Sequence, residues 1–521
     1  MAATEPTGMR AYVRPLALAL IVLAVTSIPL VYAVTTEPHD RVFMGFFVNG
    51  ADMNSYLEKM REGSDGLWYW INRYSTETSP PVYLFIWLLA WGHLAALLHL
   101  GALAAFQLFR VSGAIALFLA AWAFIRHFCR PDAQRFALYL LAFTMGFGIL
   151  IWAVGSPVVL GHHTDALDLR MPELSAFFSI LTGPTWPAAF VVAGAVLTLR
   201  AVESGDLRLA APAAFAWLGE ASMHPQMLVV LFVVLGVALA WRGPGARGWA
   251  AAAVAIGPAL PYLGYATWVS SRSAEVLRWQ AQGVDGYAPD ALSLAVALLP
   301  AVVPAALAIP GRLRRRSRED VFLLAWLLAV MAVMWVPNPA SSIGRRFLDG
   351  IYVPLACLAA DGLYGVVISR LHSARSRRLV PFSYLAVSAI TPAFAVLALV
   401  GTAHASQYAL TRSEYDSLLW LQRQPAGLVL SSARIGLYVP AYTDDTVYVG
   451  HYSETFQYGQ KSTQASDLLA GRADIAAFVR ARGVRYVLWT AADSEAPPAE
   501  LGAPAFSEPG SAVFVTEPTR T

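Results

Sequence analysis

Residues 15–34 read PLALALIVLAVTSIPLVYAV, a stretch of chain without a single charged side chain. An α-helix needs about 20 apolar residues to cross the hydrocarbon core of a bilayer, which is roughly 30 Å thick. Arg10 and Arg14 precede the stretch, and Lys and Arg favour cytoplasmic loops. The stretch has no clear small-x-small cleavage site, so it predicts a retained first span and a cytoplasmic N-terminus.

The composition of the whole chain agrees with a membrane protein. Of its 521 residues 57% are hydrophobic and only 14% are charged, against about 45–50% and about 25% in soluble domains. This balance excludes a soluble enzyme, a disordered protein and a nucleic-acid binder. The net charge of +3 is also too small for a basic field that would attract nucleic acid. With 2 Cys, a zinc site built from several cysteines is excluded as well.

Further apolar stretches continue the pattern to about eleven spans. They are 102–125, 136–154, 183–200, 208–222, 225–241, 249–269, 290–310, 321–336, 350–369 and 381–403. In this arrangement the arginine-rich run at 312–318 is cytoplasmic and the C-terminus lies outside. The stretch 82–100 carries Trp and His side chains, so we expect an interfacial or re-entrant helix there.

The chain after residue 403 has a different character. Strand-like pieces at 428–431, 446–449, 486–489 and 512–515 alternate with helix-like pieces at 413–422 and 474–481, which predicts a small α/β domain. The expected fold class is therefore an α-helical polytopic membrane protein with an extracytoplasmic α/β tail. Its domains would be 1–403, with outer juxtamembrane helices in 36–101, and 404–521.

Residues 50–63 predict a short amphipathic helix on the outer membrane surface. Met53, Tyr56, Leu57 and Met60 share one helical face, and most charged residues fall elsewhere. Asp52 lies in the first turn of this helix. A carboxylate there either serves the helix N-terminus electrostatically or is a functional group at the membrane boundary.

Two further groups of residues are candidate substrate or metal contacts. The outer loop that contains His162, His163, Asp168 and Glu173 has the ligand types of a divalent-cation site, although a solvated loop has the same composition. Glu220 and His224 fall at the outer end of a helical hairpin, where ionisable residues are either functional or solvated by the turn. A divalent cation is thus an open possibility, and no cofactor is certain.

Arg345 and Arg346 lie on the outer side, where the positive-inside bias disfavours them. Guanidinium groups match phosphate through a planar fork of donors, so we expect these residues to bind an anion. The alternatives are contact with lipid headgroups and pairing with Asp349. No nucleotide-binding, GxSxG or HExxH motif is present, which argues against an ATP-driven motor.

The order of these features resembles the GT-C superfamily of integral-membrane glycosyltransferases, which includes protein O-mannosyltransferases and aminoarabinose transferases. The resemblance covers residues 1–403. It is carried by Asp52 after the first span, the aromatic-rich segment 84–101, Arg110 in the next span, and Arg346-Phe347 before a span with Pro354. The tail, with Trp420-Leu421 and residues 450–455, is similar to tails of uncharacterised bacterial members. Two departures are Met53 after Asp52, where many members have a second acidic residue, and Phe347, where Tyr is usual.

The resemblance implies a transferase of the bacterial cytoplasmic membrane that acts on the outer face of the cell envelope. Its partners would be membrane lipid, a sugar carried on polyprenyl phosphate, and an acceptor glycan, lipid or protein. Asp52 would be the general base for the acceptor hydroxyl, and Arg345 and Arg346 would hold the donor phosphate. These roles fit the chemistry, because fixed guanidinium groups stabilise the phosphate charge that grows as the glycosidic bond breaks.

Two other classes of function stay open at this point. A transporter or flippase of a lipid-linked sugar would usually show internal repeats and helices broken at the midplane, and no matching halves are visible. A non-catalytic scaffold could bind a glycan or partner through its tail, where His451, Glu454 and Lys461 could line a polar site. The simpler expectation is that these three residues lie on the surface.

Overall fold

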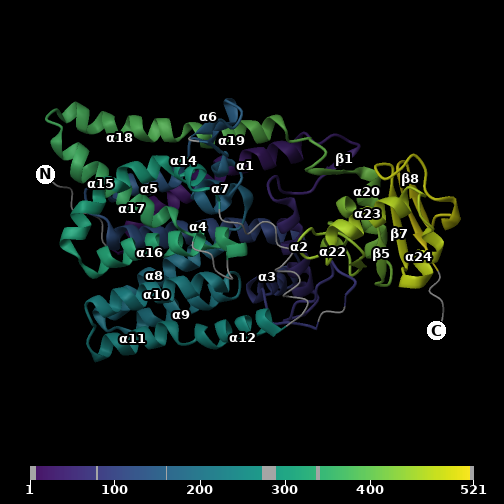
Figure 1. The fold of residues 1–521 in the computed structure, drawn as a ribbon, viewed down its shortest axis with the longest axis horizontal. Coiled ribbons are helices and arrows are strands. Elements are labelled where there is room, and N and C mark those ends of the chain that lie inside the picture. The colour runs from purple at the N-terminus through teal and green to yellow at the C-terminus, as the bar shows by residue number, and fades with distance from the viewer. Residues whose placement is uncertain (1–7, 78–79, 160, 273–288, 336–340, 517–521) are drawn as a thin grey trace. The chain divides into compact units, whose positions relative to one another are not determined.

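The computed structural model describes residues 8–77, 80–159, 161–272, 289–335 and 341–516 (Figure 1). The chain divides into two compact units. Unit 1 contains residues 1–29, 107–266 and 285–401, and unit 2 contains residues 30–106, 267–284 and 402–521. Helices α1 (Val13–Thr35), α4 (Ala102–Phe128) and α12 (Ala259–Arg272) each begin in one of these sets of residues and end in the other.

Unit 1 is almost entirely helical. Its helices are α5 (Gln134–Phe143), α6 (Gly148–Ala153), α7 (Ala176–Thr182), α8 (Trp186–Ser204), α9 (Leu207–Ala221), α10 (Pro225–Trp241), α11 (Ala246–Ile256), α12 (Ala259–Arg272), α14 (Ala291–Ala297), α15 (Leu299–Arg315), α16 (Arg318–Trp335), α17 (Tyr352–Gly362), α18 (Ala374–Ser388) and α19 (Ile390–Gly401). Short 3₁₀ helices η2 (Leu167–Leu169), η3 (Pro172–Leu174) and η5 (Ser341–Leu348) and a ribbon of β2 (Val158–Val159) and β3 (His162–His163) complete the described elements used below.

Six described helical segments are long and apolar enough to cross a membrane. They are Arg10–Thr35, Ala102–Phe128, Gln134–Ala153, Trp186–Ser204, Tyr352–Arg370 and Ala374–Gly401. The number rises to eight if two bent pairs each count as one span: α11 with α12, bent by 42°, and α14 with α15, bent by 93°. Pro258 and Pro300 lie at these two breaks, where a proline removes a backbone N–H from the helical ladder. The chain is therefore a multi-pass membrane protein.

Three of the expected spans, 208–222, 225–241 and 321–336, fold as α9, α10 and α16, which fall outside that set. Helices α9 and α10 have only 15 and 17 residues, and α16 begins with three charged residues. By length and composition the structure supports six to eight spans, and the count of about eleven stays a prediction.

In unit 2 the helices α2 (Gly50–Ser64) and α3 (Ile86–Leu97) pack against each other at unusually short range. A Cβ atom on Gly63 would lie 2.1 Å from the carbonyl oxygen of Leu89, and one on Gly92 would lie 2.0 Å from that of Met60. Only glycine allows this approach. Helix α3 has 12 residues, about 18 Å at 1.5 Å per residue, so it is too short to span and fits the expected interfacial or re-entrant helix.

The tail contributes a five-stranded sheet in the order β6-β5-β7-β9-β8. Its strands are β5 (Leu428–Leu430), β6 (Thr446–Val447), β7 (Tyr486–Thr490), β8 (Phe506–Glu508) and β9 (Ser511–Val515). Strand β5 runs parallel to β6 and β7, with Val429 opposite Tyr486, and β9 runs antiparallel to β7 and β8. All four predicted strands are present, and β8 is an additional one. A separate pair, β1 (Arg41–Phe43) and β4 (Ala409–Thr411), joins the start of the tail to the segment after α1.

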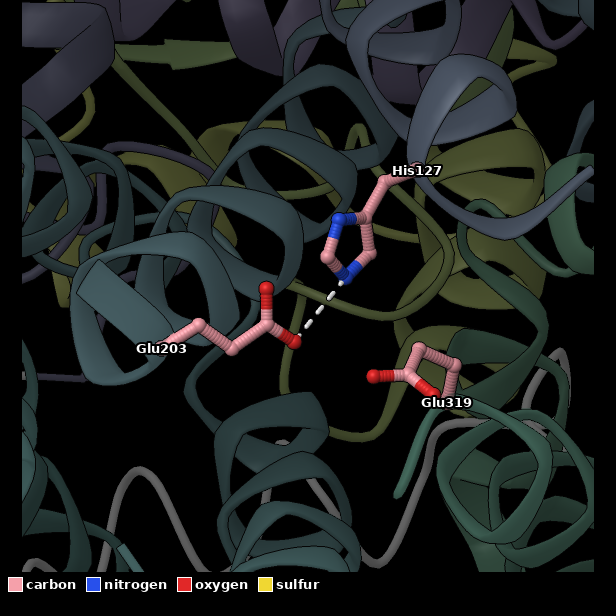
Figure 2. A group of neighbouring side chains, drawn as sticks. All are labelled: His127, Glu203 and Glu319. Carbon is pink, nitrogen blue, oxygen red and sulfur yellow. Dashed lines mark ion pairs between the residues drawn. The ribbon is translucent and has the colours of Figure 1, made fainter. Parts of the chain in front are cut away.

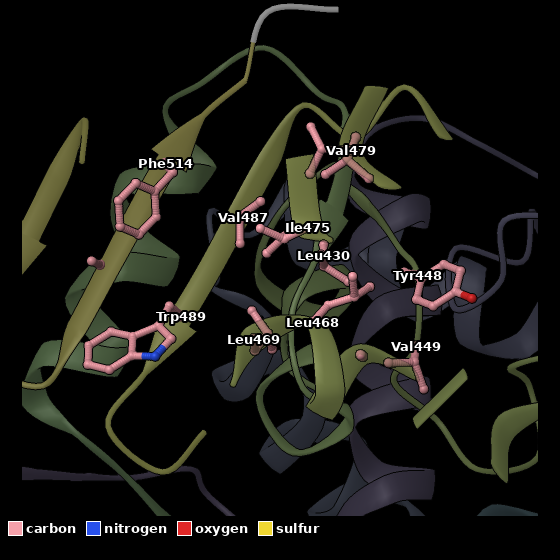
Figure 3. Packing of buried hydrophobic residues seen from close by; sticks show 13 residues of the cluster. Leu430, Tyr448, Val449, Leu468, Leu469, Ile475, Val479, Val487, Trp489 and Phe514 are labelled. Carbon is pink, nitrogen blue, oxygen red and sulfur yellow. The ribbon is translucent and has the colours of Figure 1, made fainter. Parts of the chain in front are cut away.

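Five described helices accompany this sheet in the tail. They are α20 (Arg412–Gln422), α21 (Ala433–Gly436), α22 (Val439–Tyr442), α23 (Tyr458–Leu469) and α24 (Ile475–Arg482). Of these, α23 and α24 bury apolar side chains against the sheet. Figure 3 shows the main cluster, where Leu468 and Ile475 of the helices meet Leu430 and Val487 of the strands. Each fully buried side chain of this kind stabilises the fold by about 1.5–3 kcal/mol relative to its exposed state.

Candidate functional site

Asp52 lies in the first turn of α2, as expected, and its carboxylate is hydrogen-bonded on one side and faces an imidazole on the other. Asn49, which precedes the helix in the left-handed conformation (φ 61°), donates from Nδ2 to Asp52 Oδ2 at 2.8 Å. The Nε2 atom of His451 lies 3.6 Å from Asp52 Oδ1. The exposed fraction of the Asp52 side chain is 12%, so the group is largely shielded but retains contact with solvent.

The hydrogen bonds of His451 fix its tautomer. Its Nδ1 accepts from the backbone N–H of Ser453 at 3.2 Å and of Glu454 at 3.3 Å. A nitrogen that accepts such bonds carries no proton, so in the neutral ring the proton resides on Nε2, the atom that faces Asp52. The tail thus presents a proton donor to the carboxylate from a residue far away in sequence.

The rest of α2 is buried on nearly all sides, which corrects the expectation of a helix lying on the membrane surface. Glu58 and Glu62 are 0% exposed and Lys59 is 1% exposed. The charged face meets side chains of unit 2 in place of headgroups and water. We call Ser55, Glu58, Lys59, Glu62, Arg73 and Glu454 the α2 cluster.

Lys59 is the centre of the α2 cluster. Its Nζ donates to Ser55 Oγ at 2.7 Å, to Glu454 Oε1 at 3.2 Å and to Glu58 Oε2 at 3.4 Å. The ammonium also lies over the rings of Trp70 and Phe85, 4.7 and 4.8 Å from their centroids. Lys59 is thereby surrounded by anionic and aromatic groups.

The charge states in the α2 cluster follow from burial and pairing. Burial alone would lower the pKa of Lys59, but Glu454 and Glu58 outweigh it and the pKa is raised. Burial likewise opposes ionisation of Glu454, yet Lys59 and His451 hold its pKa below the ordinary value. The pKa of Glu58 is raised well above its usual range by burial and by the nearby charge of Glu62. The ionised pair is therefore Lys59 with Glu454.

The tail residues His451, Glu454 and Lys461 are not surface residues, which corrects that expectation. They are 2%, 5% and 4% exposed. Lys461 Nζ donates to Glu77 Oε2 at 2.7 Å and to Thr76 Oγ1 at 3.1 Å. Sequence reasoning missed their partners because these lie hundreds of positions earlier in the chain.

In unit 1, Arg345 and Arg346 on η5 face one carboxylate on η3. Glu173 Oε1 lies 3.7 Å from Arg345 Nε and 3.5 Å from Arg346 Nη1. Two guanidinium groups against a single carboxylate leave one positive charge, which suits an anion. Asp349, the alternative partner of these arginines, forms a hydrogen bond with His224 through Oδ2.

Glu220, His224 and Asp349 form a buried group next to these arginines. His224 Nδ1 and Asp349 Oδ2 are 2.6 Å apart, and one ligand atom from each of the three residues lies within 4.8 Å of the others. A cavity is lined by His224, Asp349, Glu173, Arg346 and Tyr352, together with Pro172, Ser179, Pro184, Ala188 and Gly350. The local spacing of Glu220 and His224 identified these two residues in the sequence, but nothing in the sequence indicated that Asp349 belongs to the same group.

The loop residues His162, His163, Asp168 and Glu173 do not share one environment in the described part of the chain. Asp168 Oδ2 accepts from the backbone N–H of Gly148 at 3.1 Å, and burial raises the pKa of Asp168 to about 6. His163 is exposed in the ribbon, Glu173 faces the arginines, and the side chain of His162 is outside the described residues. A cation site within this loop stays a prediction.

One further group escaped sequence reasoning. His127 at the end of α4, Glu203 at the end of α8 and Glu319 at the start of α16 point toward one another (Figure 2). His127 Nε2 lies 3.6 Å from Glu203 Oε1, and 34% of the Glu203 side chain is exposed. Because three separate helices supply these residues, no spacing in the sequence could reveal the group.

Comparison with known proteins gives no match to a family model and no match to a curated protein. Among solved structures, the chain is similar to the oligosaccharyltransferase of Archaeoglobus fulgidus tethered with an acceptor peptide. That match has 12% identity and a TM-score of 0.58, and covers 92% of this chain and 69% of that one. The same enzyme in complex with Zn and sulfate matches at 14% identity with a TM-score of 0.56, covering 91% and 68%.

A mycobacterial arabinofuranosyltransferase, AftD, is also similar. It matches at 13% identity with a TM-score of 0.50, and the match covers 96% of this chain but 42% of that longer one. Identities this low show the fold alone. The chain shares the fold of these glycosyltransferases, in agreement with the resemblance found in the sequence. The type of glycosyltransferase stays a prediction.

Proposed function

We propose that this chain, with its GT-C fold, is a membrane glycosyltransferase that takes a sugar from a polyprenyl-phosphate donor on the extracytoplasmic face. The observation that carries the proposal is the Asp52 carboxylate, held by Asn49 and faced by the Nε2–H of His451. A carboxylate that is held by one hydrogen bond and still 12% exposed can accept a proton from a bound hydroxyl.

In the proposed reaction, Asp52 takes the proton of the acceptor hydroxyl as its oxygen bonds to the anomeric carbon of the sugar. The bond from that carbon to the donor phosphate oxygen breaks, and polyprenyl phosphate leaves with the electron pair. Arg345 and Arg346 stabilise the charge that develops on the phosphate, with Glu173 fixing their orientation. No nucleotide and no ATP hydrolysis enters the reaction.

The acceptor is a glycan, a lipid or a protein. The Archaeoglobus oligosaccharyltransferase was captured with an acceptor peptide, so a peptide belongs among the acceptors to be tested first. The finer topology is also part of the proposal: about eleven spans, including α9, α10 and α16, with the N-terminus cytoplasmic and the tail outside a bacterial inner membrane.

The test is Asp52→Asn in the full chain, reconstituted with polyprenyl-phosphate sugars and a panel of acceptors. Loss of the base should lower the rate of transfer by about 10²–10⁴-fold, while thermal unfolding stays close to that of the wild type. Mass spectrometry of the product measures the transfer. The matched control is Asp65→Asn at the end of the same helix, where the carboxylate is 48% exposed and pairs with Arg61.

Full activity of Asp52→Asn would overturn the assignment of the base. Flux of lipid-linked sugar across reconstituted vesicles without any glycosyl product would overturn the enzymatic proposal in favour of a transporter. Binding of a glycan by the tail without transfer or flux would favour the scaffold.

A further inference from the structure

We propose that Glu220, His224 and Asp349 bind one divalent transition-metal cation, for which Zn²⁺ is the appropriate probe. The three residues come from the last turn of α9, the residue before α10, and the turn after η5. They offer one imidazole nitrogen and two carboxylate oxygens within 4.8 Å of one another. Zn²⁺ favours this mixed nitrogen and oxygen donor set over the all-oxygen sets that suit Mg²⁺ and Ca²⁺.

The strongest sign of a ligand is Glu220 itself. Its exposed fraction is 0%, and neither carboxylate oxygen has a hydrogen-bond partner among the described residues. A buried polar group without a partner costs about 1–3 kcal/mol, and more if it is charged. A bound cation would satisfy both oxygens and offset the repulsion between Glu220 and Asp349.

The geometry leaves room for such an ion. Metal–ligand bonds of about 2.0–2.2 Å place tetrahedral ligand atoms roughly 3.3–3.6 Å apart. The three atoms already lie within 4.8 Å, so small movements bring them to these distances: His224 Nδ1 and Asp349 Oδ2, now 2.6 Å apart, separate, and more distant atoms approach. His224 and Asp349 also line a cavity together with Arg346 and Glu173.

The group of His127, Glu203 and Glu319 provides a built-in contrast. It also offers one imidazole and two carboxylates within 4.8 Å, but 34% of the Glu203 side chain and 14% of the His127 side chain are exposed. Water can reach Glu203, whereas His127 Nε2 is buried without a hydrogen-bond partner among the described residues, so solvent satisfies this group only in part. A comparison of Zn²⁺ binding at the two groups therefore tests whether the Glu220 group requires a metal or is only a cluster of ligand-type residues.

The experiment uses the full chain in detergent, stripped with a chelator and then titrated with Zn²⁺. We expect one tightly held Zn²⁺ per chain by elemental mass spectrometry, with an affinity at least tenfold lower in Glu220→Gln and in Asp349→Asn. Glu203→Gln is the matched control and should bind as the wild type does. Metal binding is measured without donor or acceptor, so the outcome is independent of the proposed sugar transfer.

X-ray absorption on the Zn²⁺-loaded wild-type chain keeps the proposal testable if a variant fails to fold. The expected spectrum has one imidazole nitrogen with oxygen ligands and no sulfur. Three results would overturn the proposal: no Zn²⁺ retained by the wild type, unchanged binding in Glu220→Gln, or a loss in Glu203→Gln equal to that in Glu220→Gln.

Discussion

The α2 cluster in unit 2 and the Glu220 group in unit 1 both contain buried carboxylates. In the α2 cluster every carboxylate keeps at least one bonded oxygen: Glu58 and Glu454 bond Lys59, and Glu62 bonds Arg73 at 3.0 Å. Glu220 has no bonded oxygen among the described residues.

This difference indicates that the α2 cluster is a structural network and that the Glu220 group is a ligand site. The α2 cluster carries its own cations, Lys59 and Arg73, which pair with Glu454 and Glu62, and the raised pKa of Glu58 favours its neutral form. The three residues of the Glu220 group are two carboxylates and one imidazole, and Glu220 has no cationic partner among the described residues, so its charge is compensated by a proton or by an ion. The following predictions test that division.

Lys59→Met should have the largest effect. Methionine preserves the contact with Trp70 and Phe85 but removes the cation from Glu454 and Glu58. Breaking a buried pair by removing one partner typically costs about 3–5 kcal/mol. Denaturant unfolding of the full chain in detergent measures the loss, and hydrogen exchange should place the loss of protection in α2.

Lys461→Met is the control for that experiment. Lys461 pairs with Glu77, whose side chain is 29% exposed, so solvent can replace the lost partner. A loss of roughly 1 kcal/mol or less is expected, as for exposed pairs. Equal losses in the two variants would contradict the central role of Lys59.

Asp445 tests whether an unpartnered oxygen by itself indicates a ligand. It is 1% exposed, its Oδ1 accepts from Gly427 N–H at 2.8 Å, and its Oδ2 has no partner among the described residues. Burial raises the pKa of Asp445 from 3.8 to about 6. With one bonded oxygen and no group of three possible ligands around it among the described residues, we expect a proton and not a metal here.

The sign of the pH effect follows from that shift. The folded state holds the proton more tightly than the unfolded state, so this contribution is full below about pH 4 and is lost as pH rises through about 6. At about 1.36 kcal/mol per unit, the loss reaches at most about 3 kcal/mol. Asp445→Asn should abolish this slope in unfolding measured from pH 4 to 8. An unchanged slope would assign the titration to another group.

Removal of metal should destabilise unit 1 without affecting unit 2. Free Zn²⁺ at 100 times its dissociation constant stabilises a binding fold by about 2.7 kcal/mol. Chelation should therefore reduce hydrogen-exchange protection in α9 and α10 but not in α2. In Glu220→Gln the chelator should have no effect, and a metal-dependent change in α2 would mean that the two clusters do not differ in the way proposed.

The fold was largely predictable because its signals are local. The spacing of Met53, Tyr56, Leu57 and Met60 predicted α2 correctly, since it depends only on positions within one helix. The residues that the polar face of α2 contacts could not be predicted. Lys59 meets Glu454 from the distant tail, and a helix that presents charge to a buried partner has the same pattern as one that presents charge to water.

The same distinction between local and distant contacts applies to the candidate sites. Glu220 and His224 were recognised because they adjoin in sequence, whereas Asp349, which completes their group, comes from another element. The loop that contains Asp168 and Glu173 was predicted as one cluster, but Asp168 bonds the backbone at Gly148 while Glu173 faces Arg345 and Arg346. Residues that are close in the sequence of a loop need not be close in the fold, because each can bind a different partner elsewhere in the structure.

His451 connects the α2 cluster to Asp52, and its substitution should have the smallest effect. Its Nε2 atom lies 3.6 Å from Asp52 Oδ1 and helps to orient that carboxylate, so it acts as a positioning residue. In His451→Ala we expect kcat to fall about tenfold, or about 1.4 kcal/mol, with KM little changed. His451→Gln, whose side-chain amide can offer an N–H near the former Nε2, should restore most of the rate. A structural role alone would lower stability in both variants without recovery of kcat in His451→Gln, which would contradict the positioning role.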